Sequence, residues 1–470
     1  MNTNNNNNIN NSEPKKLNRR SFLKAMGVGT AGVAASTMVG CTSGNRATPN
    51  QRPRGEMTMR YNPHSNEWVS LLGHGHMRLE LEYNAEGQAI GIDQNIANDL
   101  IDAAIAGGVN MFDTAPGYTR GWSEASLGLA LKRHPRDKWL ISTKMSNLNG
   151  PFDRQSCIEM YQRSRERMQV EVIDYYHLHN VGRSIENFHQ RYIDNGILDY
   201  LLNEKAEGRI RNLGWSFHGN LETFDYILHY NNIQWDFGMI VLNYLDWFNP
   251  AGQSQYLYNE MVKKNVPIKI MSPLQGGRLS RVNAEAFRQM AAINPNASPS
   301  EWGLRFAASP APTEGILNVL SGMRFVEQMA ENVTTFSPLV PINERESEML
   351  QRVREIITGG DYVQCTECNY CMPCPYGIDI VGIFGHFNRA VTAGNVVRRS
   401  DDPNFARARR RFLIGYDRNV ERKRQAASCI ECGICNTKCP YRINIPAELR
   451  RVNEYVENLR QNREFGLDEG

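Results

Sequence analysis

The sequence predicts an α/β protein, a (β/α)8 barrel (TIM barrel) followed by a smaller, mainly helical domain. Two observations indicate this architecture. Short apolar runs alternate with amphipathic helical stretches over residues 57–339, which is the pattern of eight strand–helix units. Beyond that region, eight of the ten cysteines fall into two runs. A chain of 470 residues is long enough for two or three domains.

Eight polar residues mark where the predicted strands end. We expect strands at 69–72, 109–112, 139–142, 172–176, 210–215, 237–242, 267–271 and 316–320. The polar residues at their ends are, in chain order, His74, Asp113, Lys144, His179, Ser216, Asn243, Ser272 and Ser321. The carboxyl ends of the strands in such a barrel share one face, and that face carries the active site. These side chains are therefore predicted to surround one site.

Each cysteine run has the spacing of an iron–sulfur ligand set. The first run is C-x2-C-x2-C-x2-C and the second is C-x2-C-x2-C-x3-C, each followed by Pro; the residues are Cys365, Cys368, Cys371, Cys374, Cys429, Cys432, Cys435 and Cys439. Thiolates two residues apart on a tight turn can converge on one [4Fe–4S] cube, with a distant Cys-Pro cysteine as fourth ligand. Zinc ribbons use two separated C-x2-C pairs instead. The spacing predicts two [4Fe–4S] clusters in preference to zinc or disulfides.

The two runs together resemble those of paired-cluster ferredoxins. In such proteins the fourth cysteine of each run ligates the other cluster. The resemblance implies a ferredoxin-like dicluster domain over 340–470. It also implies one cluster on Cys365, Cys368, Cys371 and Cys439, and a second on Cys429, Cys432, Cys435 and Cys374.

The first forty residues are predicted to be an export signal. The stretch 18–24, NRRSFLK, resembles a twin-arginine signal, and the Gly/Ala-rich stretch behind it is too short for a convincing membrane span. The sequence MVGC at 38–41 resembles a lipoprotein cleavage box, so Cys41 is a candidate lipid anchor; the alternative is a soluble exported protein. We expect a periplasmic protein or a membrane-anchored lipoprotein, with 41–56 as a linker. The twin-arginine route carries folded proteins, which suits clusters inserted before export.

Four motifs in the predicted barrel resemble those of the aldo-keto reductase family. They are FDTAPGY at 112–118, SEASLG at 123–128, STK at 142–144 and DYYHLH at 174–179. The resemblance covers about residues 57–332, and the cysteine domain extends it to a branch of the family fused to a ferredoxin-like domain. It implies an oxidoreductase that interconverts a small carbonyl compound and its alcohol with a nicotinamide cofactor.

The motifs supply four groups that carbonyl reduction needs. Tyr118 is the predicted general acid, because the developing alkoxide must receive a proton. A phenol is a poor acid at neutral pH, so we expect the ammonium of Lys144 to lower its pKa, with Asp113 holding the lysine in place. His179 is expected to hold the carbonyl oxygen by a hydrogen bond.

The dinucleotide site is implied by the resemblance alone. It places Ser216 and Asn243 near the nicotinamide, and the adenosine end on Ser321, Gly322, Arg324, Gln328 and Asn332. Gly322 and Gln328 stand where the family commonly has lysine and arginine around the 2′-phosphate, which leaves Arg324 for that role. Either NADP(H) or NAD(H) therefore fits, with NADP(H) slightly favoured.

Three further histidines lie in or beside the predicted barrel strands. We expect His74 and His76 to line the substrate pocket, because two histidines alone are too few for a metal site. His177 is expected on the outer face of its strand.

The sequence leaves the role of the clusters open. They could exchange electrons with the barrel or with a partner protein, and the arginine-rich segment 407–411 could dock an acidic one. Alternatively, the chain is an electron-transfer protein whose barrel is a docking scaffold, or the clusters are structural. The net charge of +3 gives no indication of nucleic-acid binding.

Overall fold

The computed structural model describes residues 57–249, 253–310, 315–397 and 399–461, and its centre is a closed parallel barrel of eight strands. The strands, in spatial order, are β3 (Leu72–Gly75), β6 (Met111–Asp113), β7 (Leu140–Met145), β8 (Ile173–Val181), β9 (Ile210–Phe217), β10 (Phe237–Val241), β11 (Ile268–Met271) and β12 (Ile316–Ser321). Neighbours in space are neighbours in sequence, as right-handed strand–helix–strand units require. The predicted fold class is confirmed.

Helices surround the barrel and cover its apolar outer wall. They include α2 (Gln94–Ala106), α3 (Ser123–Leu131), α4 (Arg154–Met168), α6 (Ile197–Ala206), α7 (Leu221–Leu228), α8 (Tyr244–Trp247), α9 (Ser254–Lys263), α10 (Ala284–Ile293), α11 (Pro299–Ala308) and α12 (Val326–Thr335). Several begin at a side chain that satisfies free backbone N–H groups. Asp93, for example, accepts hydrogen bonds from the backbone of Asn95 and Ile96 at the start of α2.

Two antiparallel hairpins were not expected from the sequence. The first, β1 (Met59–Asn62) with β2 (Glu67–Ser70), precedes the first barrel strand; the strand predicted at 69–72 was wrong, because this range ends the hairpin and the barrel strand β3 begins only at Leu72. Its Glu67 accepts a hydrogen bond of 2.7 Å from the hydroxyl of Tyr175, at the amino end of the barrel strands. The second is β4 (Leu81–Tyr83) with β5 (Ala89–Ile92). Because the first hairpin contacts this end of the barrel, the active site is left to the opposite, carboxyl end.

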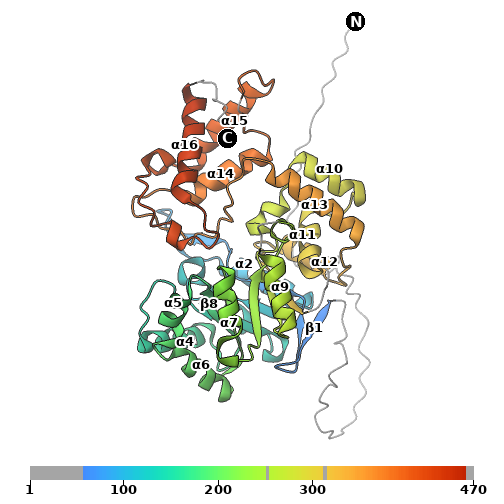
Figure 1. The fold of residues 1–470 in the computed structure, drawn as a ribbon, viewed down its shortest axis with the longest axis vertical. Helices are drawn as coiled ribbons and strands as arrows, with labels where there is room; N and C mark the ends of the chain where they lie inside the picture. The colour runs from blue at the N-terminus through green and yellow to red at the C-terminus, as the bar shows by residue number, and fades with distance from the viewer. Residues whose placement is uncertain (1–56, 250–252, 311–314, 398, 462–470) are drawn as a thin grey trace.

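Helix α13 (Glu344–Thr358) belongs to the barrel, although we expected the barrel to end at residue 339. Its side chains Met349, Leu350 and Val353 are buried in the same hydrophobic core as the barrel helices. Figure 1 shows α13 alongside α10. The predicted boundary came too early because α13 is charged on its solvent face, which looked like a change of composition.

The C-terminal domain has its own core. Helices α14 (Ile380–Thr392), α15 (Phe405–Asn419) and α16 (Ile445–Gln461) pack their apolar faces on one another around Phe412. They form a group separate from the barrel helices (Figure 1). The first cysteine run lies in the segment between α13 and α14, and the second lies between α15 and α16.

The predicted export signal, the linker and Cys41 lie outside the described residues. Within the described residues, we find no helix with the length and apolar character that crossing a bilayer requires.

Candidate active site and cysteine clusters

A cavity of about 560 Å³ opens at the carboxyl end of the barrel strands, and both domains line it. From the barrel come Asp113, Tyr118, Lys144 and His179. From the C-terminal domain come Cys368, Tyr370, Pro440 and Tyr441. The four predicted catalytic residues therefore meet at one site, and the cysteine domain forms part of its wall.

Lys144 and Asp113 form a buried ion pair at the base of this cavity. The lysine Nζ lies 2.5 Å from Asp113 Oδ1 and donates a second hydrogen bond of 2.7 Å to the Thr114 carbonyl. The other Asp113 oxygen accepts a 2.7 Å hydrogen bond from Ser142 Oγ. A buried charge needs such partners, and here both members of the pair have them. The neighbouring strands β6 and β7 bring the two side chains together.

Tyr118 stands at the start of a short 3-10 turn, Tyr118–Gly121, that follows β6. The Lys144 Nζ lies over its ring, 4.8 Å from the centroid. Burial and the Asp113 carboxylate raise the pKa of Tyr118 well above its ordinary value. The expected lowering of this pKa by Lys144 is therefore wrong for the structure as described, because the ammonium is held by Asp113 and faces the ring.

His179 is held as a neutral imidazole. Its Nδ1 lies 2.5 Å from Ser146 Oγ, and its backbone carbonyl accepts a 2.6 Å hydrogen bond from the buried Arg191. Burial, with Lys144 and Arg191 nearby, lowers the pKa of His179 well below its usual range. A neutral ring carries one N–H, so Nε2 can donate to an oxygen if Ser146 donates to Nδ1.

Tyr370, which sequence reasoning missed, completes this group. Its hydroxyl lies 3.1 Å from His179 Nε2 and within hydrogen-bonding reach of the Tyr118 hydroxyl. It comes from the cysteine domain, between Cys368 and Cys371.

A second lysine lies inside the barrel, beneath the ion pair. Lys269 is fully buried and donates a 3.1 Å hydrogen bond to Ser142 Oγ. Burial lowers its pKa from 10.5 to about 7. His177 is also inside the barrel, 2.8 Å from Ser142 Oγ, so its predicted outward position is wrong. Residues two apart in a strand share a face, and His177 therefore points to the same side as His179.

Neither His74 nor His76 is among the described residues that line the cavity. Both are fully buried, and they contact each other, with His74 Nε2 3.1 Å from His76 Nδ1. His76 Nε2 lies 3.3 Å from Ser126 Oγ on helix α3. The predicted pocket role is wrong because this histidine pair packs against α3.

Most residues assigned to the dinucleotide do line the cavity. They are Ser216, Ser321, Gly322, Arg324, Gln328 and Asn332. Asn332 donates a 3.0 Å hydrogen bond to Ser321 Oγ, and Arg324 forms an ion pair with Glu80. Asn243 is not among the described lining residues; it is buried, and its side chain caps α8.

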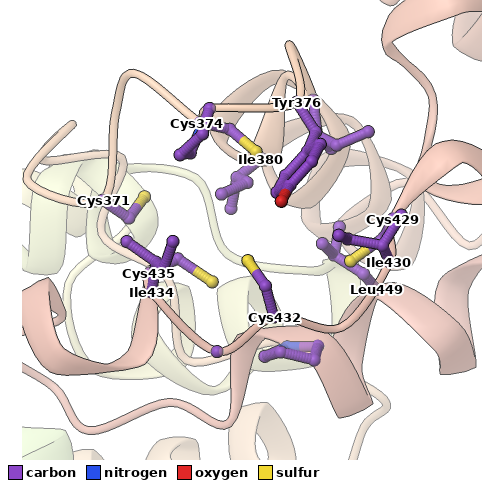
Figure 2. Close-up of a pocket in the computed structure, with 14 residues that line it drawn as sticks. Cys371, Cys374, Tyr376, Ile380, Cys429, Ile430, Cys432, Ile434, Cys435 and Leu449 are labelled. Atoms are coloured by element: carbon purple, nitrogen blue, oxygen red, sulfur yellow. The ribbon is translucent and has the colours of Figure 1, made fainter.

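The eight cysteines gather around two neighbouring hollows. Cys365, Cys368, Cys371 and Cys439 line the one beside the active-site cavity. The other is lined by Cys374, Cys429, Cys432 and Cys435, with Cys371 at its edge, and Figure 2 shows their sulfur atoms directed toward a shared space. This is the grouping that crossed ligation requires; ligation itself stays a prediction.

The donor set suits iron–sulfur cubes better than single ions. All eight thiols are free, and in the described residues no group of three or more possible ligands lies close enough to hold one metal ion. A cube keeps its four thiolates further apart than one ion does. Burial raises the pKa of Cys365 and of Cys371 to about 12, so a bound cluster has to displace their protons.

The fold and this site define a barrel oxidoreductase with an attached iron–sulfur domain. The chain belongs to the aldo/keto reductase family, whose model matches residues 71–355. The model of the 4Fe-4S dicluster domain matches residues 364–445. The predicted family and the predicted dicluster domain are both confirmed.

Individual relatives are distant. The NADH-specific methylglyoxal reductase of Escherichia coli (strain K12) is 34% identical over 140 residues, which are 26% of this chain and 41% of that protein, less than half its length. L-galactose dehydrogenase of Arabidopsis thaliana is 26% identical over 273 residues, covering 53% of this chain and 80% of that protein. The holo form of aldo-keto reductase AKR11C1 from Bacillus halodurans superposes with a TM-score of 0.50 at 23% identity, over 63% of this chain and 96% of that one, which is a likeness of fold.

Proposed function

We propose that this protein interconverts a small carbonyl compound and its alcohol with a nicotinamide dinucleotide, and that Tyr118 is the general acid. One observation carries the proposal: Tyr118, Lys144, Asp113 and His179 converge on a single cavity at the carboxyl end of the barrel. Buried titratable groups with shifted pKa values, gathered in a cleft, are typical of active sites.

The residues divide the work of carbonyl reduction. The dinucleotide, when bound, supplies the hydride. Neutral His179 donates a hydrogen bond that holds the carbonyl oxygen, and Tyr118 then gives that oxygen its proton. Burial raises the pKa of Tyr118 and makes it a weaker acid, but the developing alkoxide is a stronger base than a phenolate and can still take its proton.

The cavity mouth suits a negatively charged cofactor. Arg78, Arg281 and Arg324 all line it, and a dinucleotide carries phosphates that guanidinium groups bind well. Of these, Arg324 is the predicted contact for a 2′-phosphate, yet it is paired with Glu80. This carboxylate would repel a 2′-phosphate, so NAD(H) fits this mouth better than NADP(H).

The clusters would connect the cavity to the surface. The hollow with Cys368 adjoins the active site, whereas Cys432 of the other is exposed. Tyr376 and Ile430 beside it are 52% and 59% exposed. Exposed apolar residues around a redox centre suit a weak, transient electron-transfer complex, and such a partner is part of the proposal. The same feature favours the second candidate, an electron-transfer protein whose barrel is a scaffold.

Export is a separate proposal and rests on the sequence alone. Replacing both arginines of the signal, Arg19→Lys with Arg20→Lys, should leave the protein in the cytosol if the twin-arginine route carries it. Export that continues in this variant would remove that part of the proposal, and labelling with a radioactive fatty acid would test Cys41 as the lipid anchor.

The catalytic proposal is tested with Tyr118→Phe. Anaerobically purified protein is assayed against a panel of small aldehydes, ketones and sugars with NADH and NADPH, and dinucleotide binding is measured separately by fluorescence. We expect turnover to fall by about 10²–10⁴ while the dinucleotide dissociation constant stays within about twofold. Tyr441→Phe, another tyrosine in the same cavity, is the control. Normal turnover in Tyr118→Phe would contradict the proposed catalytic role of Tyr118.

A further inference from the structure

The cysteine domain places a hydroxyl group between the two residues that would hold the substrate oxygen. The Tyr370 hydroxyl lies 3.1 Å from His179 Nε2 and within hydrogen-bonding reach of Tyr118. Under the proposed function, these are the two donors to a carbonyl oxygen. Tyr370 thus stands where a substrate oxygen has to bind.

Several contacts between the domains hold the segment that carries Tyr370. Arg78 of the barrel donates a hydrogen bond to the Thr366 carbonyl. Gly276, with φ +68°, approaches the same carbonyl so closely that a Cβ there would lie 2.2 Å from its oxygen. The Arg278 guanidinium lies 4.4 Å from the centre of the Tyr362 ring. Since backbone and side chains on both sides are fitted to each other, the position of Tyr370 is a built feature of the fold.

The internal repeat of the cysteine domain shows that the cluster turn itself needs no hydroxyl here. Glu367 and Asn369 in the first run have positive φ, and so do Glu431 and Gly433 at the matching positions of the second run. Tyr370 then corresponds to Ile434, which is 43% exposed and lines the other cysteine hollow. One turn carries an aliphatic side chain and the equivalent turn carries a phenol, so the Tyr370 hydroxyl serves the cavity that it enters.

We propose that Tyr370 is a specificity-determining residue that occupies the oxygen subsite of the substrate-free enzyme. This inference rests on the proposed function for the identity of that subsite. A substrate binds only when its oxygen replaces the Tyr370 hydroxyl on both Tyr118 and His179. Ligands whose oxygen accepts from both donors compensate for the two lost hydrogen bonds; ligands that reach one donor do not.

Removing the hydroxyl should strengthen the binding of small oxygen ligands. Acetate is the probe, because it needs no turnover, and its dissociation constant is measured by calorimetry on the iron-loaded protein. Each hydrogen bond is worth about two- to twelvefold in affinity, so Tyr370→Phe, which loses two of them, should bind acetate about 4- to 140-fold more tightly than wild type. Tyr370→Ile, which copies Ile434 of the second run, should do the same.

Tyr441→Phe is the matched control. Tyr441 lines the same cavity from the same domain, but its hydroxyl lies 3.0 Å from Ser272 Oγ. We expect its acetate affinity to remain within about twofold of wild type. All variants are compared at equal iron content, because Tyr370 neighbours two cysteines.

The outcomes separate this inference from the proposed function. Tighter acetate binding in both Tyr370 variants, with control affinity unchanged, supports the oxygen-subsite role even if Tyr118→Phe retains turnover. Unchanged or weaker acetate binding overturns it. With an active substrate, a lower KM at similar kcat supports it, whereas a large loss of kcat at constant KM would make Tyr370 a proton donor and overturns it.

Discussion

The buried lysine inside the barrel should make stability depend on pH in a way that one substitution removes. Lys269 is fully buried, and its Nζ lies 4.7 Å from the centroid of the Tyr175 ring and 5.3 Å from that of Phe237. The carboxylate of Asp113 offsets only part of the cost of burying this charge. We therefore predict that Lys269→Met abolishes a component of stability that rises with pH.

The sign follows from the two pKa values of Lys269. In the folded protein its pKa is about 7, and in the unfolded chain it is near 10.5. Between these values the unfolded chain binds more protons, so stability rises with pH. The full difference corresponds to about 5 kcal/mol, at 1.36 kcal/mol for each pH unit. Between pH 7.5 and 9.0, wild type should gain about 2 kcal/mol relative to Lys269→Met.

Thermal unfolding at several pH values measures this difference. For a barrel domain of about 300 residues, about 2 kcal/mol corresponds to a change of roughly 3 °C in the Tm difference between wild type and variant. Comparing matched proteins cancels the contributions of other groups, including the clusters. Lys263→Met, at a lysine whose side chain is 69% exposed, is the control and should show no such trend. A Tm difference for Lys269→Met that is constant from pH 7.5 to 9.0 would refute the reasoning.

Two further predictions concern the cofactors. Glu80→Gln should free Arg324 and raise the affinity for NADPH relative to NADH by up to about fivefold, because an exposed ion pair is worth at most about 1 kcal/mol. If the ratio of NADPH affinity to NADH affinity is the same in the variant and in wild type, this prediction is wrong. Under crossed ligation, Cys439→Ser should perturb the same cluster signal in electron paramagnetic resonance as Cys365→Ser. If the spectrum of Cys439→Ser matches that of Cys429→Ser instead, ligation is not crossed. Metal analysis that finds zinc in place of about eight irons per chain would exclude both ligation schemes.

Much of the barrel was predictable because strand positions follow from apolar periodicity. Polar residues that end those strands, such as Lys144 and His179, were placed correctly at one cavity for the same reason. Asn243 shows the limit of this pattern, since it follows β10 yet its side chain serves as a helix cap. A polar residue after a strand can satisfy the backbone or line a site, and spacing alone does not distinguish the two.

The pKa of Tyr118 was predicted in the wrong direction because the sequence contains no distances. Proximity of an ammonium was inferred from the motif, but its effect depends on whether it faces the hydroxyl or the ring. In the structure Lys144 is hydrogen-bonded to Asp113 and lies over the Tyr118 ring, so burial determines the direction in which the pKa of Tyr118 shifts. Buried groups such as Lys269 escaped notice altogether, since a lysine within an apolar strand carries no motif.

The role of Tyr370 could have been suspected from the sequence by aligning the two cysteine runs. Position by position, Thr366 to Tyr370 matches Ile430 to Ile434, and both runs end in Cys-Pro-Tyr. Ligand spacing accounts for the cysteines, and the turn accounts for the positive φ values, but neither accounts for a phenol in one copy and an aliphatic side chain in the other. Where two otherwise equivalent copies carry different side chains, the difference reflects the different surroundings of the two copies. Here one copy lines the active-site cavity, whereas the other is 43% exposed at the second cysteine hollow, so we expect the iron–sulfur domain to act on substrate binding through the wall that it shares with the barrel.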